Sequence, residues 1–121
     1  MQTMWKFTIG RFTIRAEIMP DDDLDLSWDE TGETRANLES GFWEAFITKV
    51  SVELNGAEIA ADWLGGSIYE NPSDFFTEHY GLAHFNRLTG AHCGAYFPDM
   101  VRAAISGARQ WMRDAGMAAA A

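Results

Sequence analysis

The stretch F-I-T-K-V-S-V-E-L-N-G, Phe46 to Gly56, decides the fold. Apolar and polar side chains alternate along it, which is the pattern of a strand with one face in the core. The expected inward residues are Phe46, Val50, Val52 and Leu54, and the expected outward residues are Lys49, Ser51 and Glu53.

The dipeptide Asn55-Gly56 ends this strand and is a strong signal for a tight β-hairpin. Residues 57 to 62 should therefore return antiparallel to it. We expect a break at Gly65-Gly66, as a bulge or turn, and a further strand through residues 67 to 69.

The N-terminal residues repeat F-T-I on either side of Gly10-Arg11. Two β-rich runs around a short turn with glycine predict a second hairpin. One long strand with a bulge at Gly10 is the alternative. Either arrangement places a β element before residue 20.

The last third of the chain has helical signals. Asn71-Pro72 predicts a helix start, Gly81 its end, and residues 82 to 97 are assigned to a loop. Pro98 should open a long helix with a cationic stripe on its outer face. Its apolar positions are Phe97, Val101, Ala104, Ile105, Ala108, Trp111 and Met112, and its stripe is Arg102, Ser106, Arg109 and Arg113.

The predicted fold is a single α+β domain over residues 1 to 117: an antiparallel sheet with a short helix and a long C-terminal amphipathic helix packed on it. Residues 118 to 121 form an alanine tail that should fray. Cys93 is the only cysteine, and no apolar run has the length of a signal or membrane segment. We expect a cytoplasmic protein.

The whole chain has a net charge of -9, and its negative charge is concentrated in one segment. The acidic segment, residues 21 to 33, holds seven carboxylates and no base: Asp21, Asp22, Asp23, Asp25, Asp29, Glu30 and Glu33. Such a surface repels nucleic acid and anionic membranes, and it suits a basic protein partner. Alternation of Leu24, Leu26 and Trp28 with polar residues predicts a strand with the carboxylates outwards.

Metal binding is the first chemistry to test. An EF-hand loop counted from Asp21 fails because position six is Leu26 and position twelve is Gly32, where Gly and Glu are required. A looser Mg²⁺ or Ca²⁺ site among the acids stays open. Four residues could bind zinc, namely His79, His84, His92 and Cys93. Their spacing matches no usual zinc motif.

Nucleic-acid mimicry is the second function to consider. Outward carboxylates on a strand would recur every ~6.6 Å, about two nucleotide steps along one strand of B-DNA. Solubility is the plainer explanation of an acidic surface. Cys93 with its neighbour His92 lacks the surroundings of a catalytic pair.

Four segments resemble a group of small acidic proteins of bacterial plasmids, integrative elements and phages: residues 29 to 38, D-E-T-G-E-T-R-A-N-L; residues 59 to 69, I-A-A-D-W-L-G-G-S-I-Y; residues 71 to 76, N-P-S-D-F-F; and residues 96 to 105, Y-F-P-D-M-V-R-A-A-I. The resemblance implies an accessory role on a mobile element, such as anti-CRISPR or antirestriction inhibition. It carries over no catalytic residues.

The function predicted from the sequence is therefore a non-enzymatic inhibitor. Its seven acids would bind a basic nucleic-acid-binding protein or defence complex, without a cofactor. The alternative is a small metal-dependent enzyme or metal-stabilised module that uses the His/Cys or Asp residues. A third is a homo-oligomer in which the acids contact Arg102, Arg109 and Arg113 of another copy.

Overall fold

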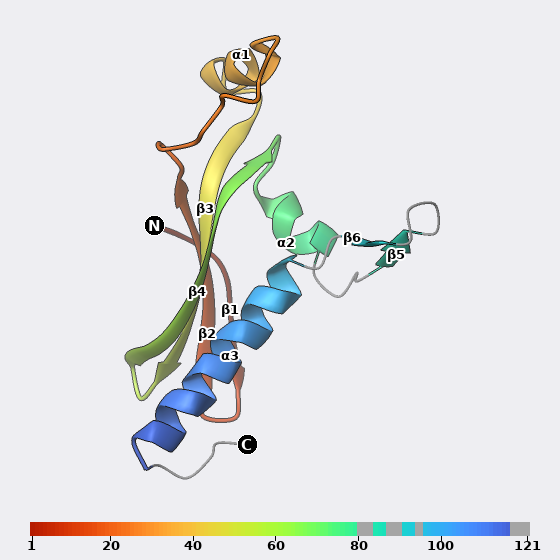
Figure 1. Cartoon of the computed structure of the whole chain (residues 1–121). Helices are drawn as coiled ribbons and strands as arrows, with labels where there is room; N and C mark the ends of the chain where they lie inside the picture. Colours follow the sequence, from red (N-terminus) through yellow and green to blue (C-terminus); the bar gives the residue numbers. More distant parts are fainter. Residues whose placement is uncertain (80–83, 87–90, 94–95, 117–121) are drawn as a thin grey trace.

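A four-stranded antiparallel sheet in the order β1-β2-β3-β4 forms the centre of the structure, a computed structural model (Figure 1). It describes residues 1–79, 84–86, 91–93 and 96–116. The strands are β1 (Gln2–Ile9), β2 (Phe12–Pro20), β3 (Glu44–Leu54) and β4 (Ala57–Tyr69). Helix α3 (Tyr96–Asp114) packs across β4 and β3, so the predicted α+β class is confirmed.

Both predicted hairpins are present. Asn55 and Gly56 have φ angles of 53° and 81°, and Leu54 pairs directly with Ala57 across the turn. Gly10, with φ of 57°, turns the chain between β1 and β2. Glycine and asparagine tolerate these positive φ angles better than other residues. The alternative of one long N-terminal strand is wrong.

The core lies between one face of the sheet and α3. All four apolar residues expected to point inwards from β3 are buried, and Ile14 and Ala16 of β2 join them. Ser51 was expected to point outwards and is nevertheless only 1% exposed; it pairs with the longer Arg15 of β2 on one side and with Ala61 of β4 on the other. Helix α3 packs closely on β4 at Gly107, where an added Cβ would lie 3.5 Å from that of Ala60, an ordinary contact.

Helix α2 (Ser73–His79) closes one end of the core. The Asn71 side chain accepts a hydrogen bond of 3.1 Å from the Ser73 amide, which confirms the predicted helix start. Phe75 and Phe76 are buried and meet the rings of Phe46 and Phe97 edge-on. These contacts join α2, β3 and α3.

Two predictions about helix α3 need correction. Helix α3 begins two residues before Pro98, because the first-turn amide that proline lacks has no partner inside a helix. Trp111 is 43% exposed although its spacing places it on the apolar face, and Met100, which the spacing left out, is buried in the core. The cationic stripe is exposed as predicted.

Strand β4 continues through Gly65-Gly66 without ending there, but the bulge that was one of the two predicted forms of the break is present. The register shifts between the pairs Phe46–Ser67 and Thr48–Leu64, and Gly66 has φ of 75°, so the glycines form a bulge. Residues predicted as loop include a two-stranded sheet, β5 (His84–Asn86) and β6 (Ala91–Cys93). The alanine tail lies outside the described residues.

Candidate functional site

The acidic segment follows β2 as a series of turns, so the predicted strand over residues 21 to 29 is wrong. Asp21 accepts a hydrogen bond from the Asp23 amide at 3.3 Å, and Asp25 accepts one from the Ser27 amide at 2.9 Å. Aspartate forms such turns with the amide two residues ahead, in competition with strand pairing. Trp28, expected inwards, is 59% exposed.

Asp21 ties the start of the acidic segment to the sheet. Its second carboxylate oxygen accepts a hydrogen bond of 2.8 Å from the backbone amide of Gly66, at the β4 bulge. Its own amide donates to the carbonyl of Ala45 at the start of β3. Asp21 therefore has a structural role, although the sequence offered it as a partner contact.

Asp29 ties down the far end of the segment. Its carboxylate accepts hydrogen bonds from the amides of Thr34, at 3.4 Å, and Arg35, at 3.0 Å, in the first turn of α1 (Glu33–Glu39). These amides have no partner within the helix, so Asp29 caps it. The helix ends just before Gly41, whose φ of 81° turns the chain towards β3.

Asp25 is exposed and remains ionised more readily than a typical aspartate. The hydrogen bond from the Ser27 amide, followed by one with the Ser27 side chain, lowers the pKa of the Asp25 carboxyl from its ordinary value of 3.8. Its negative charge is accordingly present throughout the neutral and mildly acidic range.

The other four acids of the segment are free. Within the described part of the chain they make no hydrogen bond or ion pair through their carboxylates, and all four are exposed. They are Asp22, Asp23, Glu30 and Glu33. The segment thus divides into acids that shape the loop and acids whose charge faces solvent.

Further acids gather at the same end of the sheet. Glu39 ends α1, Glu44 begins β3 and Glu70 follows β4, and Arg35 of α1 lies among them. The two hairpin turns and the C-terminal end of α3 lie at the opposite end of the molecule (Figure 1). Arg11, Arg109 and Arg113 belong to that end. Glu53, Glu58 and Asp114 lie at that end as well, so the excess of negative charge belongs to the end that holds the acidic segment.

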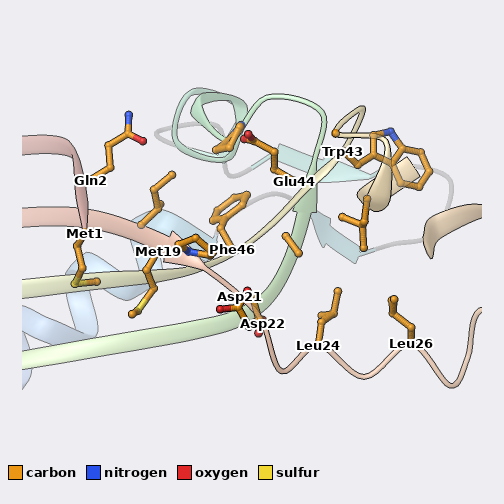
Figure 2. A pocket seen from close by; sticks show the side chains of 16 residues that line it. Met1, Gln2, Met19, Asp21, Asp22, Leu24, Leu26, Trp43, Glu44 and Phe46 are labelled. Carbon is orange, nitrogen blue, oxygen red and sulfur yellow. The ribbon is translucent and has the colours of Figure 1, made fainter. Parts of the chain in front are cut away.

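A pocket of about 750 Å³ opens beside the acidic segment (Figure 2). Leu24 and Leu26 point from the loop into this pocket, and Trp43 and Glu44 bound it on the side of β3. Phe46 lies at its base. Its other lining residues are Met1, Gln2, Ile18, Met19, Pro20, Asp21, Asp22, Leu38, Gly41, Ala45 and Pro72.

Aromatic side chains are exposed around this pocket. Trp28 is 59% exposed and Phe42 is 54% exposed, and the Phe42 ring lies 6.4 Å from that of Trp43. A smaller hollow of about 210 Å³ lies between Trp28, Trp43 and Glu70. Exposed aromatic residues next to apolar hollows are typical of protein-binding surfaces.

The zinc ligands suggested by the sequence fall largely outside what can be described. His79 lies in α2, and His84 pairs with Cys93, next to His92, in the β5–β6 sheet. Their side chains lie outside the described residues. Among side chains that the structure does describe, no three metal-ligating groups gather, and the metal alternative stays a prediction from the sequence.

The sequence predicted the acids of this site but missed its pocket. The signal was present, because Leu24 and Leu26 are apolar residues in a segment too rich in aspartate for a strand. The described residues around the pocket offer carboxylates and apolar walls, which suit the binding of a cationic apolar group. No helix in the described parts is long and apolar enough to cross a membrane. Searches of protein-family models, curated sequences and solved structures find no match to this chain.

Proposed function

We propose that this protein is a non-enzymatic inhibitor that binds a basic, nucleic-acid-handling protein through its acidic segment. It acts in the cytoplasm of a bacterial host and keeps nucleic acid from the surface it covers. The resemblance to acidic proteins of mobile elements favours a defence complex, of the CRISPR or restriction type, as the partner. Neither nucleic acid nor a membrane is bound directly, since both are anionic.

One observation carries the proposal: the four free carboxylates lie on a loop and at the start of the helix that follows it, and Asp21 and Asp29 hold this segment in place. Asp21 holds the loop to β4 and Asp29 holds it to α1, while four other acids remain unpaired within the described structure. Negative charge for solubility alone needs no fixed position. A preorganised charged loop loses less conformational entropy when a partner binds.

The loop changes the kind of mimicry that is proposed. A strand would have set its carboxylates in one evenly spaced row, whereas the turns at Asp21 and Asp25 break this even spacing. The protein therefore resembles nucleic acid in charge density and not in phosphate spacing. Lys and Arg side chains of the partner are long enough to adapt to such a surface.

The test is affinity capture from a bacterial lysate with elution by salt. The test variant neutralises the four free acids: Asp22→Asn, Asp23→Asn, Glu30→Gln and Glu33→Gln. The control variant removes the same charge from four exposed acids elsewhere: Glu58→Gln, Asp74→Asn, Asp99→Asn and Asp114→Asn. The control breaks the ion pairs of Glu58 with Lys49 and of Asp99 with Arg102 and alters the hydrogen bond of Asp114 with Gln110; because all the replaced acids are exposed, both variants should fold.

We expect wild type and control to capture the same basic protein, and the test variant to capture at least about tenfold less. Each missing charge pair weakens binding, and several act together. Wild-type protein should then displace labelled DNA or RNA from the captured protein in a mobility-shift assay. Equal capture by both variants, or a partner that keeps its nucleic acid, would overturn the proposal.

A further inference from the structure

The pocket beside the acidic segment is larger and more apolar than charge recognition requires. A volume of about 750 Å³ lies within the range of ligand-binding sites. Its walls come from three separate parts of the chain: Leu24 and Leu26 from the loop, Leu38 from α1, and Trp43 before β3. Each of these side chains is only partly buried, so apolar surface faces the opening.

Acidic groups surround this apolar surface. Asp22 and Glu44 line the pocket, and both are exposed. Asp21 also lines it, but both of its carboxylate oxygens already accept backbone hydrogen bonds. A group that enters the pocket therefore meets apolar walls at its centre and unpaired negative charge at its edge. Charge complementarity selects an apolar group with cations beside it.

We infer that the pocket receives the apolar side chains of a basic amphipathic helix from the partner protein. Two apolar residues one helical turn apart would contact Leu24, Leu26 and Trp43, while neighbouring Lys or Arg residues would meet Asp22 and Glu44. Binding of a helix in an apolar groove uses anchors with this spacing. The inference rests on the proposed function and specifies which part of the partner is recognised.

A second copy of this chain is a poorer occupant. Its α3 carries Arg102, Arg109 and Arg113, but the apolar face of that helix is buried against its own sheet. Trp111 is the most exposed apolar side chain of the second half of α3, and it lies on the other side of the helix from the arginines. The helix therefore offers charge without two free apolar anchors.

The pocket adds selectivity that charge alone lacks. Contacts between exposed charges weaken as salt rises, whereas burial of an apolar side chain does not depend on screening. A partner helix with both features should stay bound at salt concentrations that release other cationic proteins. The pocket would thus distinguish one basic protein from the many in a cell.

The experiment measures the binding of three synthetic helical peptides by calorimetry at low and high salt. The first peptide has Lys and Arg around two leucines one turn apart. The second replaces both leucines by serine, and the third keeps the leucines but replaces Lys and Arg by glutamine. The proteins are wild type, Leu26→Asn in the pocket, and Ile9→Asn, a matched substitution of a partly exposed residue at the opposite end.

We expect wild type and Ile9→Asn to bind the first peptide at least about tenfold more tightly than the second, as burial of one leucine allows. Leu26→Asn should remove this preference and retain the weaker, salt-sensitive binding of both basic peptides. Leu24→Asn serves as a second pocket variant, and thermal unfolding confirms that each variant is folded.

Equal affinity of wild type for both basic peptides would overturn the pocket inference and leave the proposed charge-based inhibition standing. Equal affinity for the first and third peptides would overturn the role of Asp22 and Glu44. The absence of binding to all three peptides would also overturn the inference, whereas the proposed function is decided separately by the capture experiment.

Discussion

The carboxylate of Asp21 accepts a hydrogen bond of 2.8 Å from the backbone amide of Gly66, which lies 45 residues further along the chain. This bond joins the first residue of the acidic segment to the bulge in β4. The bulge turns the Gly66 amide away from the strand ladder, and glycine permits the positive φ angle that this requires. An irregularity in one strand thus fixes the position of the charged loop.

Asp21→Ala should lower the free energy of unfolding by about 1–2 kcal/mol, because it removes the acceptor of two backbone amides, including a charge-assisted bond. Urea unfolding measures the change. Asp22→Ala is the matched control, since the Asp22 carboxylate makes no hydrogen bond within the described structure, and it should change stability by less than about 0.5 kcal/mol. Equal effects would contradict the anchoring role of Asp21.

Asp29→Ala should loosen α1 locally. Two first-turn amides lose their acceptor, and loss of a cap costs about 1 kcal/mol. Hydrogen exchange should speed up for the amides of α1 while those of β2 and β3 remain protected. The neighbouring substitution Glu30→Ala provides the control, because it leaves the cap intact. Unchanged exchange in α1 would show that the helix does not depend on Asp29.

The Asp25 carboxyl should titrate below 3.8 in an NMR pH titration. A lowered pKa in the folded state means that the Ser27 hydrogen bonds stabilise the fold fully above the unfolded pKa. This contribution is lost as the pH falls through the folded pKa, in the strongly acidic range. Ser27→Ala removes the side-chain bond but keeps the backbone bond, so the pKa should rise part of the way to 3.8.

Thr48→Val should stabilise the protein by about 0.5–1.5 kcal/mol. Thr48 is fully buried on the core face of β3, and within the described structure its hydroxyl has no hydrogen-bond partner. Valine keeps the shape and removes an unsatisfied polar group. The reverse substitution nearby, Val50→Thr, buries a new hydroxyl and should destabilise. Thermal or urea unfolding of both variants tests the pair, and a loss of stability in Thr48→Val would contradict the assignment.

Gly107→Ala should also stabilise, by about 0.5–1 kcal/mol, because alanine loses less backbone entropy in a helix. The added Cβ would lie 3.5 Å from that of Ala60, an ordinary contact. Gly107→Leu has no such room and should lower the unfolding temperature. If leucine were tolerated as well as alanine, α3 would not pack closely on β4.

The sequence predicts those parts of the fold that depend on local conformation. Asn55-Gly56 and Gly10 mark turns because few other residues adopt their φ angles, and Asn71 marks a helix start because its side chain accepts a first-turn amide. The alternation of apolar and polar residues then predicts β3 correctly, because its apolar side chains are buried in the core.

The same alternation fails in the acidic segment. Leu24 and Leu26 alternate with acids, but the carboxylates of Asp21 and Asp25 accept hydrogen bonds from backbone amides two residues ahead. These amides are then not free for pairing with a neighbouring strand. The bond from Gly66 to Asp21 depends on the bulge in β4, which lies too far along the chain for local patterns to reveal. The pocket is missed for the same reason, because its walls meet only after β3 and α1 are placed.

The excess of acids at one end of the sheet makes the molecule an electric dipole as well as an anion. The field of a basic partner would turn it during diffusion, so that the loop leads and the arginines of α3 trail. Association should therefore slow steeply as salt screens this torque. Dissociation should change little, because apolar contacts hold the complex once it has formed. The association rate constant would thus depend on the charges, and the dissociation rate constant on the apolar contacts.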